Sequence, residues 1–262
     1  MIFYFSGTGN SQWVAKSLSR LLNDENCVEI AEATRSERFV YSLQDGDRLG
    51  FMFPVYGWNV PKIVADFIKR MQLTDGDEPE YLYFVATCGD DTGRMLQEFR
   101  KLAKLRNWEL KSAYAIQMPN TYVCLPGFDV DNKALEQLKL QKARQEIERI
   151  GEEIIKKRQG VFETRPGLFP RFKTYVLGSY FRHFLMTDKP FHVNDCCTKC
   201  GICVRVCLTK NIQLGNGGPH WEGHCTSCLA CYHHCPQHAI QFGRQTSGKG
   251  QYLCTLNKLE HD

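Results

Sequence analysis

The chain has 262 residues, of which 43% are hydrophobic and 24% charged, and its formal net charge is +4. This length predicts two domains, and the composition is typical of folded globular proteins rather than disordered chains. The scattered positive charge excludes a strong nucleic-acid footprint, and no apolar run reaches the roughly 18 residues that a membrane span needs. The N-terminus lacks the features of a secretion signal, so we expect a cytoplasmic protein.

Short apolar runs alternate with amphipathic helical stretches through the first part of the chain. This pattern predicts a parallel sheet with helices on both faces. We expect five strands, at residues 2–5, 27–31, 48–53, 81–87 and 112–117. Helices are expected at residues 10–22, 61–71, 92–106 and 132–158. These elements predict a doubly wound α/β domain over residues 1–159.

A loop of small and hydroxyl-bearing residues follows the first expected strand and leads into a helix. It consists of Ser6, Gly7, Thr8, Gly9, Asn10 and Ser11. Backbone N–H groups in such a turn can approach a phosphate closely, and the helix dipole favours its negative charge. The loop lacks both the lysine of a nucleoside-triphosphate loop and the third glycine of a dinucleotide fingerprint. A phosphate monoester therefore fits it better than ATP or NAD.

Two further loops are expected at the same edge of the sheet, where doubly wound folds bind their ligands. The loop after the third strand contains Pro54, Val55, Tyr56, Gly57 and Trp58, and the loop after the fourth contains Thr87, Cys88 and Gly89. The segment after the fifth strand, with Tyr122, is a further candidate lid.

Residues 160–188 are rich in aromatic and basic side chains. A disordered linker would lack so many large apolar residues, so we expect this connector to pack across two domains. A cysteine-rich domain is expected over residues 189–245, followed by a tail, residues 246–262, about which the sequence says little.

The cysteine-rich domain repeats one spacing, CxxCxxCxxxC. Its two copies are Cys197, Cys200, Cys203, Cys207 and Cys225, Cys228, Cys231, Cys235. In such tandem motifs three cysteines bind one [4Fe-4S] cluster and the fourth binds the other. One cluster is therefore expected on Cys197, Cys200, Cys203 and Cys235. The other is expected on Cys207, Cys225, Cys228 and Cys231.

Two alternatives to this metal assignment can be weighed from the residues. A register beginning at Cys196 would place Lys199 and Ile202 at ligand positions, where neither can bind iron, so Cys196 is expected to be a spare thiol. Paired CxxC elements near histidines can also bind zinc. A zinc site does not require the complete tandem motif, and the repetition favours iron–sulfur clusters.

The cysteine-rich region resembles bacterial dicluster ferredoxins over its full length, including Pro236 after the last cysteine. The three loops of residues 1–158 resemble those of flavodoxins in order and character. This resemblance implies that the first loop holds the phosphate of FMN and that the other two flank its ring. Tyr56 or Trp58 would then stack on the ring, with Cys88 and Gly89 against its other side. The whole chain resembles a family of fused flavodoxin and ferredoxin proteins of anaerobic bacteria.

The resemblance leads us to expect an electron-transfer flavoprotein that passes single electrons between two [4Fe-4S] clusters and FMN. Its partner would be a redox protein or a low-potential donor. One alternative is a flavin-dependent reductase of a small-molecule acceptor, with a pocket built by residues 119–131, including Tyr122 and Phe128. Another is a non-enzymatic redox sensor. The sequence identifies no catalytic acid–base pair.

Overall fold

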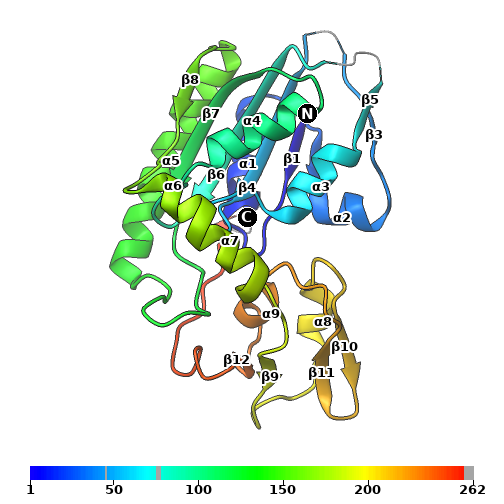
Figure 1. The fold of residues 1–262 in the computed structure, drawn as a ribbon, viewed down its shortest axis with the longest axis vertical. Coiled ribbons are helices and arrows are strands. Elements are labelled where there is room, and N and C mark those ends of the chain that lie inside the picture. Colours follow the sequence, from blue (N-terminus) through cyan, green and yellow to red (C-terminus); the bar gives the residue numbers. More distant parts are fainter. Residues whose placement is uncertain (45, 75–77, 257–262) are drawn as a thin grey trace.

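The computed structural model describes residues 1–44, 46–74 and 78–256. Figure 1 shows a parallel sheet between layers of helices and, below it, a small lobe of short strands and helices. A helical connector joins the two parts. Within the described ranges, no helix has the length and apolar character required to cross a membrane.

The central sheet has six parallel strands in the order β2-β1-β4-β6-β7-β8. They are β1 (Ile2–Tyr4), β2 (Cys27–Glu29), β4 (Arg48–Pro54), β6 (Tyr81–Cys88), β7 (Leu110–Gln117) and β8 (Val161–Glu163). Every residue of β6 is buried because helices cover both faces of the sheet. The predicted α/β fold is confirmed. The edge strand β8 was not predicted, because Val161 and Phe162 are its only apolar residues.

Helices pack on both faces of this sheet. The helices α1 (Asn10–Leu21) and α5 (Lys133–Ile155) contribute to the apolar core on one face. The other face is covered by α2 (Ile30–Arg35), α3 (Lys62–Arg70) and α4 (Met95–Leu105). A short parallel pair, β3 (Val40–Ser42) and β5 (Gln72–Thr74), lies outside the main sheet. Neither α2 nor this pair was predicted, and residues 30 and 31, expected in a strand, lie in α2.

The connector is a continuous helical stretch that includes two π-helical segments. It runs through α6 (Pro170–Phe172), η1 (Lys173–Leu177), α7 (Gly178–Tyr180) and η2 (Phe181–Leu185). It crosses from the sheet toward the small lobe (Figure 1).

The small lobe contains two antiparallel strand pairs and two short helices. The pairs are β9 (Phe191–Val193) with β12 (Ile240–Phe242) and β10 (Ile212–Gly215) with β11 (Gly218–Trp221), and the helices are α8 (Ile202–Val206) and α9 (Ala230–His233). Val123 and Cys124, from the loop after β7, are buried in the core of this lobe. The two parts of the molecule therefore share a core at their junction.

Candidate functional site

The first loop of the expected nucleotide site is held in shape by its own side chains. Gly9 has a φ of 95° and caps α1, while its backbone N–H donates to Ser6 Oγ at 3.2 Å. The hydroxyls of Ser11 and Thr87 lie 2.7 Å apart in the buried edge of the sheet. These bonds connect the first loop to the end of β6, as expected for loops that meet at the carboxyl edge of parallel strands.

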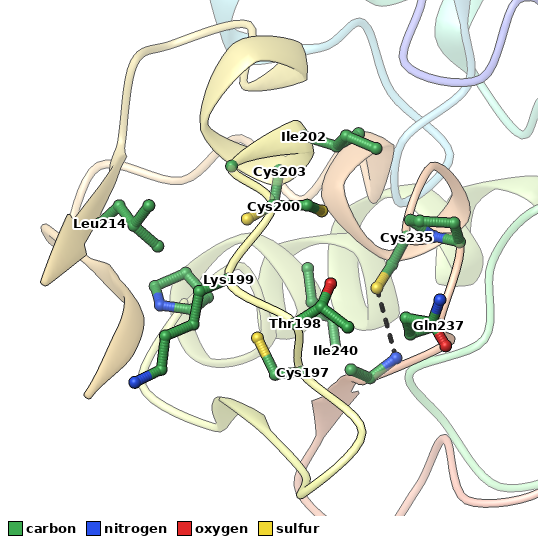
Figure 2. Close-up of a pocket in the computed structure, with 14 residues that line it drawn as sticks. Cys197, Thr198, Lys199, Cys200, Ile202, Cys203, Leu214, Cys235, Gln237 and Ile240 are labelled. Atoms are coloured by element: carbon green, nitrogen blue, oxygen red, sulfur yellow. Dashed lines mark hydrogen bonds between the residues drawn. The ribbon is translucent and has the colours of Figure 1, made fainter. Parts of the chain in front are cut away.

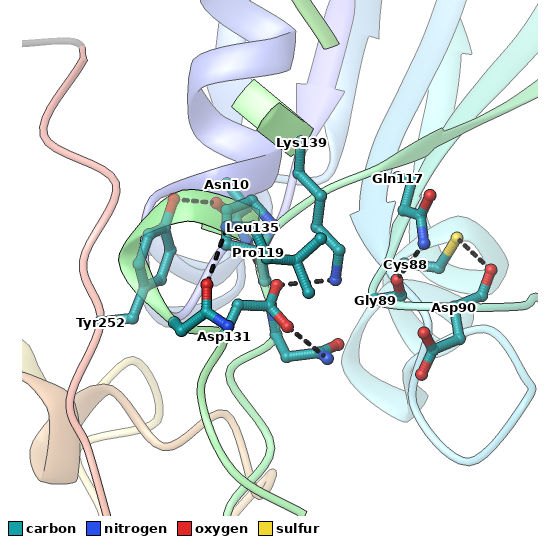
Figure 3. Close-up of polar contacts among 12 residues, drawn as sticks. Asn10, Cys88, Gly89, Asp90, Gln117, Pro119, Asp131, Leu135, Lys139 and Tyr252 are labelled. Carbon is teal, nitrogen blue, oxygen red and sulfur yellow. Dashed lines mark hydrogen bonds and ion pairs between the residues drawn. The ribbon is translucent and has the colours of Figure 1, made fainter. Parts of the chain in front are cut away.

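The side chain of Asn10 is bonded within the protein. Its Nδ2 donates to the Pro119 carbonyl at 3.0 Å, and its Oδ1 accepts from the Tyr252 hydroxyl at 2.9 Å (Figure 3). Both polar atoms of the side chain are thus engaged within the protein. In contrast, the Thr8 hydroxyl makes no hydrogen bond to a described residue. A phosphate in this loop would therefore be met by Thr8 and by the first N–H groups of α1, which lack intrahelical partners.

The second loop lies between the small lobe and the connector. Tyr56 and Asn59 exchange two backbone hydrogen bonds of 3.1 Å, and the Tyr56 ring meets the Phe5 ring edge-on at 6.1 Å. Burial raises the pKa of Tyr56 well above its usual value, with a smaller contribution from Cys228 and Cys225. The phenol therefore stays neutral beside the cysteines of the lobe.

Trp58 faces the connector instead of the cysteines. Its carbonyl accepts from Thr174 Oγ1 at 3.3 Å, and Lys173 Nζ lies 5.9 Å from the centre of its ring. Next to it, Gly57 has a φ of 54° and packs against the ring of Phe181. Of the two aromatic residues expected to stack on a flavin ring, Tyr56 is thus the one near the cysteine lobe.

The third loop packs closely against the segment after β7. Gly89 leaves room for the Asn120 side chain, whose Oδ1 would lie 1.6 Å from a Cβ at that position. Asn120 Nδ2 in turn donates to Asp131 Oδ1 at 2.9 Å, and Asp131 forms a buried ion pair with Lys139 at 2.6 Å (Figure 3). Burial raises the pKa of Cys88 to about 12, so this thiol is neutral. No motif in the sequence marks the Asp131–Lys139 pair.

The first set of cysteines lines one pocket of the small lobe. Cys197, Cys200 and Cys203 come from the loop before α8 and from α8 itself, and Cys235 comes from the end of the second motif (Figure 2). The pocket also has apolar walls, including Ile202, Leu214, Pro219 and Ile240. The backbone N–H of Ala239 donates to Cys235 Sγ at 3.3 Å. Thiolates in an apolar pocket with N–H donors suit a [4Fe-4S] cluster. The pocket combines three cysteines of the first motif with one of the second, which is the set predicted from the sequence.

The second set of cysteines is more deeply placed. Burial raises the pKa of Cys231 well above its usual value, and the nearby thiols of Cys228, Cys225 and Cys207 raise it further. The four thiols therefore form one group. Backbone N–H groups of Asn211 and Ser227 donate to Cys207 Sγ at 3.1 Å and to Cys225 Sγ at 3.3 Å. Burial raises the pKa of Cys225 to about 12, so its thiolate is unfavourable unless a cation compensates the charge. This environment fits an iron–sulfur cluster.

A single metal ion fits these cysteines less well than clusters do. Among the described residues, no three His, Cys, Asp or Glu side chains converge tightly enough to hold one ion. A cluster differs because its irons and sulfides separate the ligating thiolates. Cys196 is exposed and does not line the pocket of the first set.

The second cysteine set directly abuts the first loop of the sheet domain. A Cβ at Gly7 would lie 3.0 Å from Cys228 Cβ and even closer to the Cys228 carbonyl, so only glycine fits this contact. Cys228 also packs against the apolar core that includes Phe5. The expected phosphate loop and the cysteine lobe are thus in van der Waals contact.

The tail ties these two parts together. The backbone N–H of Cys254 donates to the Thr8 carbonyl at 2.9 Å, and the N–H of Tyr252 donates to His233 Nδ1 at 3.2 Å. His233 Nε2 lies 2.8 Å from the Thr121 carbonyl, and burial lowers the pKa of this histidine to about 4. The neutral His233 ring therefore accepts a hydrogen bond from the tail at Nδ1 and donates one to the sheet domain from Nε2. We call residues 249–254 the tail strap; no motif marks it in the sequence.

Comparison with known proteins identifies both parts of the chain. A family model described as a flavodoxin domain matches residues 1–118, and a model described as a 4Fe-4S dicluster domain matches residues 196–240. No curated protein matches the chain.

Solved structures with similar regions come from several organisms. The Trp repressor binding protein from Bacillus subtilis is 13% identical, with a TM-score of 0.35, over 57% of this chain and 96% of its own. The azoreductase from Bacillus anthracis is 8% identical, with a TM-score of 0.33, over 59% of this chain and 96% of its own. An NAD(P)H:quinone oxidoreductase from Methanothermobacter marburgensis is 11% identical, with a TM-score of 0.31, over 57% of this chain and 94% of its own.

Proposed function

We propose that this chain, which fuses a flavodoxin domain to a 4Fe-4S dicluster domain, transfers single electrons between two [4Fe-4S] clusters and FMN. The flavodoxin domain implies FMN and the dicluster domain implies iron–sulfur clusters, so the chain is a redox protein. When bound, the clusters exchange electrons singly and FMN exchanges one or two. The chain would thereby connect one-electron and two-electron chemistry as an oxidoreductase.

The observation that carries this proposal is the contact between Cys228 and the FMN loops. Cys228 touches Gly7 of the expected phosphate loop and lies close enough to Tyr56 to influence its pKa. The residues proposed to hold one cluster and those proposed to hold FMN are thus neighbours, with no intervening layer of protein at this contact. Such an arrangement supports direct exchange between the two sites.

The exposure of the cysteines supports an order for the two cluster sites. Cys200 of the first set is exposed, whereas Cys231 of the second set is buried. A redox partner protein would therefore reach the first set from solvent, while the second set lies between it and the flavodoxin domain. We propose that the chain exchanges electrons with its partner at the Cys200 side of the lobe.

In this proposal the flavodoxin domain provides the flavin site through three loops. Thr8 and the backbone N–H groups at the start of α1 would hold the phosphate. Tyr56 would lie against the flavin ring on the side of the cysteine lobe, while Gly89 and the Asn120 side chain would border it from the third loop. Burial keeps both the Tyr56 phenol and the Cys88 thiol neutral, so neither side chain would add negative charge beside the flavin ring.

The reductase alternative requires residues 119–131 to close a substrate pocket. In the structure this segment packs on the dicluster domain instead: Val123 is buried in its core, and the Thr121 carbonyl is bonded to His233. Tyr122 meets the rings of Phe128 and Phe181 edge-on, at 5.8 and 5.5 Å. This arrangement favours electron transfer between the domains over a closed pocket.

The test begins with protein purified without oxygen and analysed for FMN, iron and sulfide. We expect about one FMN and, for two four-iron clusters, about eight irons per chain. Rapid mixing with a reduced low-potential ferredoxin should then bleach the flavin, and Cys228→Ser should greatly slow that reaction. Cys196→Ser is the matched control, because this exposed cysteine lies outside both sets, and it should react like the unaltered protein.

Cys200→Ser distinguishes the loss of an inner-set ligand from a general loss of structure in the dicluster domain. It alters the outer set and leaves all four cysteines of the inner set in place. Flavin reduction that stays at the unaltered rate in Cys228→Ser, with its FMN content retained, would refute the proposed route. A chain that binds iron but no FMN would refute the proposed function itself.

A further inference from the structure

The connector helix turns an apolar face outward. Five large side chains recur along it every three or four residues, which is the spacing of one helical face. They are Phe169, Phe172, Val176, Tyr180 and Phe184, with exposed fractions of 78, 53, 53, 56 and 67%. We call these five residues the aromatic face. A contiguous exposed surface of this kind is unusual in a soluble domain and marks a site of interaction.

The opposite side of the same helix packs against the flavodoxin domain. Thr174 is fully buried, accepts a hydrogen bond of 2.8 Å from the backbone N–H of Arg94 and donates one to the Trp58 carbonyl. Gly178 is buried against the carbonyl of Gly57. The inner side thus includes Thr174, Gly178 and the ring of Phe181, and the aromatic face points away from the protein. Because the inner contacts fix the helix, rotation to hide the aromatic face would break them.

The connector helix, residues 170–185, carries only positive charge of its own, while Asp91 and Glu98 of the flavodoxin domain bond to Lys173 and Tyr175. No Asp or Glu occurs between Glu163 and Asp188, whereas the segment contains Arg165, Arg171, Lys173 and Arg182. Arg165 and Arg171 are exposed, and Lys173 is paired with Asp91 of the third loop region. A helix lying along the protein surface with aromatic residues outward and arginines beside them has the character of an interfacial membrane helix. We propose that the aromatic face binds the surface of an anionic lipid bilayer.

Other occupants suit this face less well. A second copy of the chain would bring the same uncompensated arginines together across a symmetric interface, which is repulsive. A redox protein would be expected over the exposed Cys200 on the dicluster domain, not over the connector. Phe169 and Phe184 are the most exposed members of the face, and single protruding aromatic side chains suit insertion among lipid headgroups.

The test is co-sedimentation of the cofactor-loaded protein with lipid vesicles. We expect binding to vesicles of phosphatidylcholine mixed with phosphatidylglycerol, and weaker binding to phosphatidylcholine alone. The double substitution Phe169→Ser and Phe184→Ser should reduce binding about tenfold or more, from the transfer free energy of two phenylalanines. Arg171→Ala should reduce vesicle binding about fivefold, and added salt should also weaken vesicle binding.

The chain offers a matched control for the loss of apolar surface. Val40 and Leu105 are 58 and 70% exposed, and they lie on β3 and at the end of α4. Val40→Ser with Leu105→Ser should leave vesicle binding unchanged. An equal loss in the control, or no binding of the unaltered protein to anionic vesicles, would overturn the proposal. So would a dimer in solution that the two phenylalanine substitutions dissociate while vesicle binding stays the same.

Discussion

Tyr252→Phe removes one buried hydrogen bond that joins the tail strap to the flavodoxin domain. The Tyr252 hydroxyl donates to Asn10 Oδ1 at 2.9 Å, and the two residues are 5 and 8% exposed. Burial raises the pKa of Tyr252, so the phenol remains a donor throughout the usual working range of pH. The substitution keeps the ring and the backbone bond to His233, but it leaves Asn10 Oδ1 without its donor. An unsatisfied buried acceptor costs about 1–3 kcal/mol.

We therefore expect the midpoint of anaerobic urea unfolding to fall by an amount equivalent to about 1–3 kcal/mol. Flavin fluorescence would report the flavodoxin domain, and visible absorbance would report the clusters. Because Asn10 opens α1 beside the expected phosphate, the dissociation constant of FMN should rise as well. Tyr180→Phe is the matched control: Tyr180 is exposed, and its loss of a hydroxyl should change stability by less than about 0.5 kcal/mol. Unchanged unfolding and FMN affinity in Tyr252→Phe would refute the role of the tail strap.

Three further predictions follow from the contacts between the domains and from the buried thiols. Gly7→Ala places a methyl group against Cys228 and should lower stability by about 1–3 kcal/mol and slow flavin reduction, whereas Gly217→Ala, which meets nothing within 4 Å, should do neither. Equal behaviour of the two variants would contradict the contact. Oxidative removal of iron should unfold the dicluster domain, whose core includes the cysteines themselves, while the flavodoxin domain keeps its far-ultraviolet dichroism. A fully folded iron-free lobe would speak against this. Burial raises the pKa of Cys88 to about 12, so at pH 8 its thiolate is scarce and iodoacetamide should label Cys196 but not Cys88 in the folded protein, as mass spectrometry can show. Rapid labelling of Cys88 would show that it is not buried in solution.

The sequence by itself determined the two folds and predicted the two cysteine sets, because both depend on local spacing. Tandem motifs of fixed length place Cys235 with the first set, and the structure brings Cys197, Cys200, Cys203 and Cys235 to one pocket. Mostly apolar runs of six or seven residues likewise predicted β4, β6 and β7, because parallel strands covered by helices on both faces are rich in apolar residues. The strands β3, β5 and β8 contain only one or two apolar residues each, which is too few to mark a strand in the sequence.

The tertiary structure alone decided how the two domains meet. Asn10 and Tyr252 are 242 residues apart in the chain, and nothing in either local sequence indicates that one bonds to the other. The side chain of Asn10 bonds to the tail strap and to the loop at Pro119, while its backbone stays at the start of α1. The connector was expected to pack across the domains. Its inner side packs on the flavodoxin domain, and Asp188 at its end accepts a hydrogen bond from Asn211 of the dicluster domain, but only the structure shows that the aromatic face points outward. Local spacing specifies elements and ligand sets, whereas contacts between distant segments depend on how those elements pack.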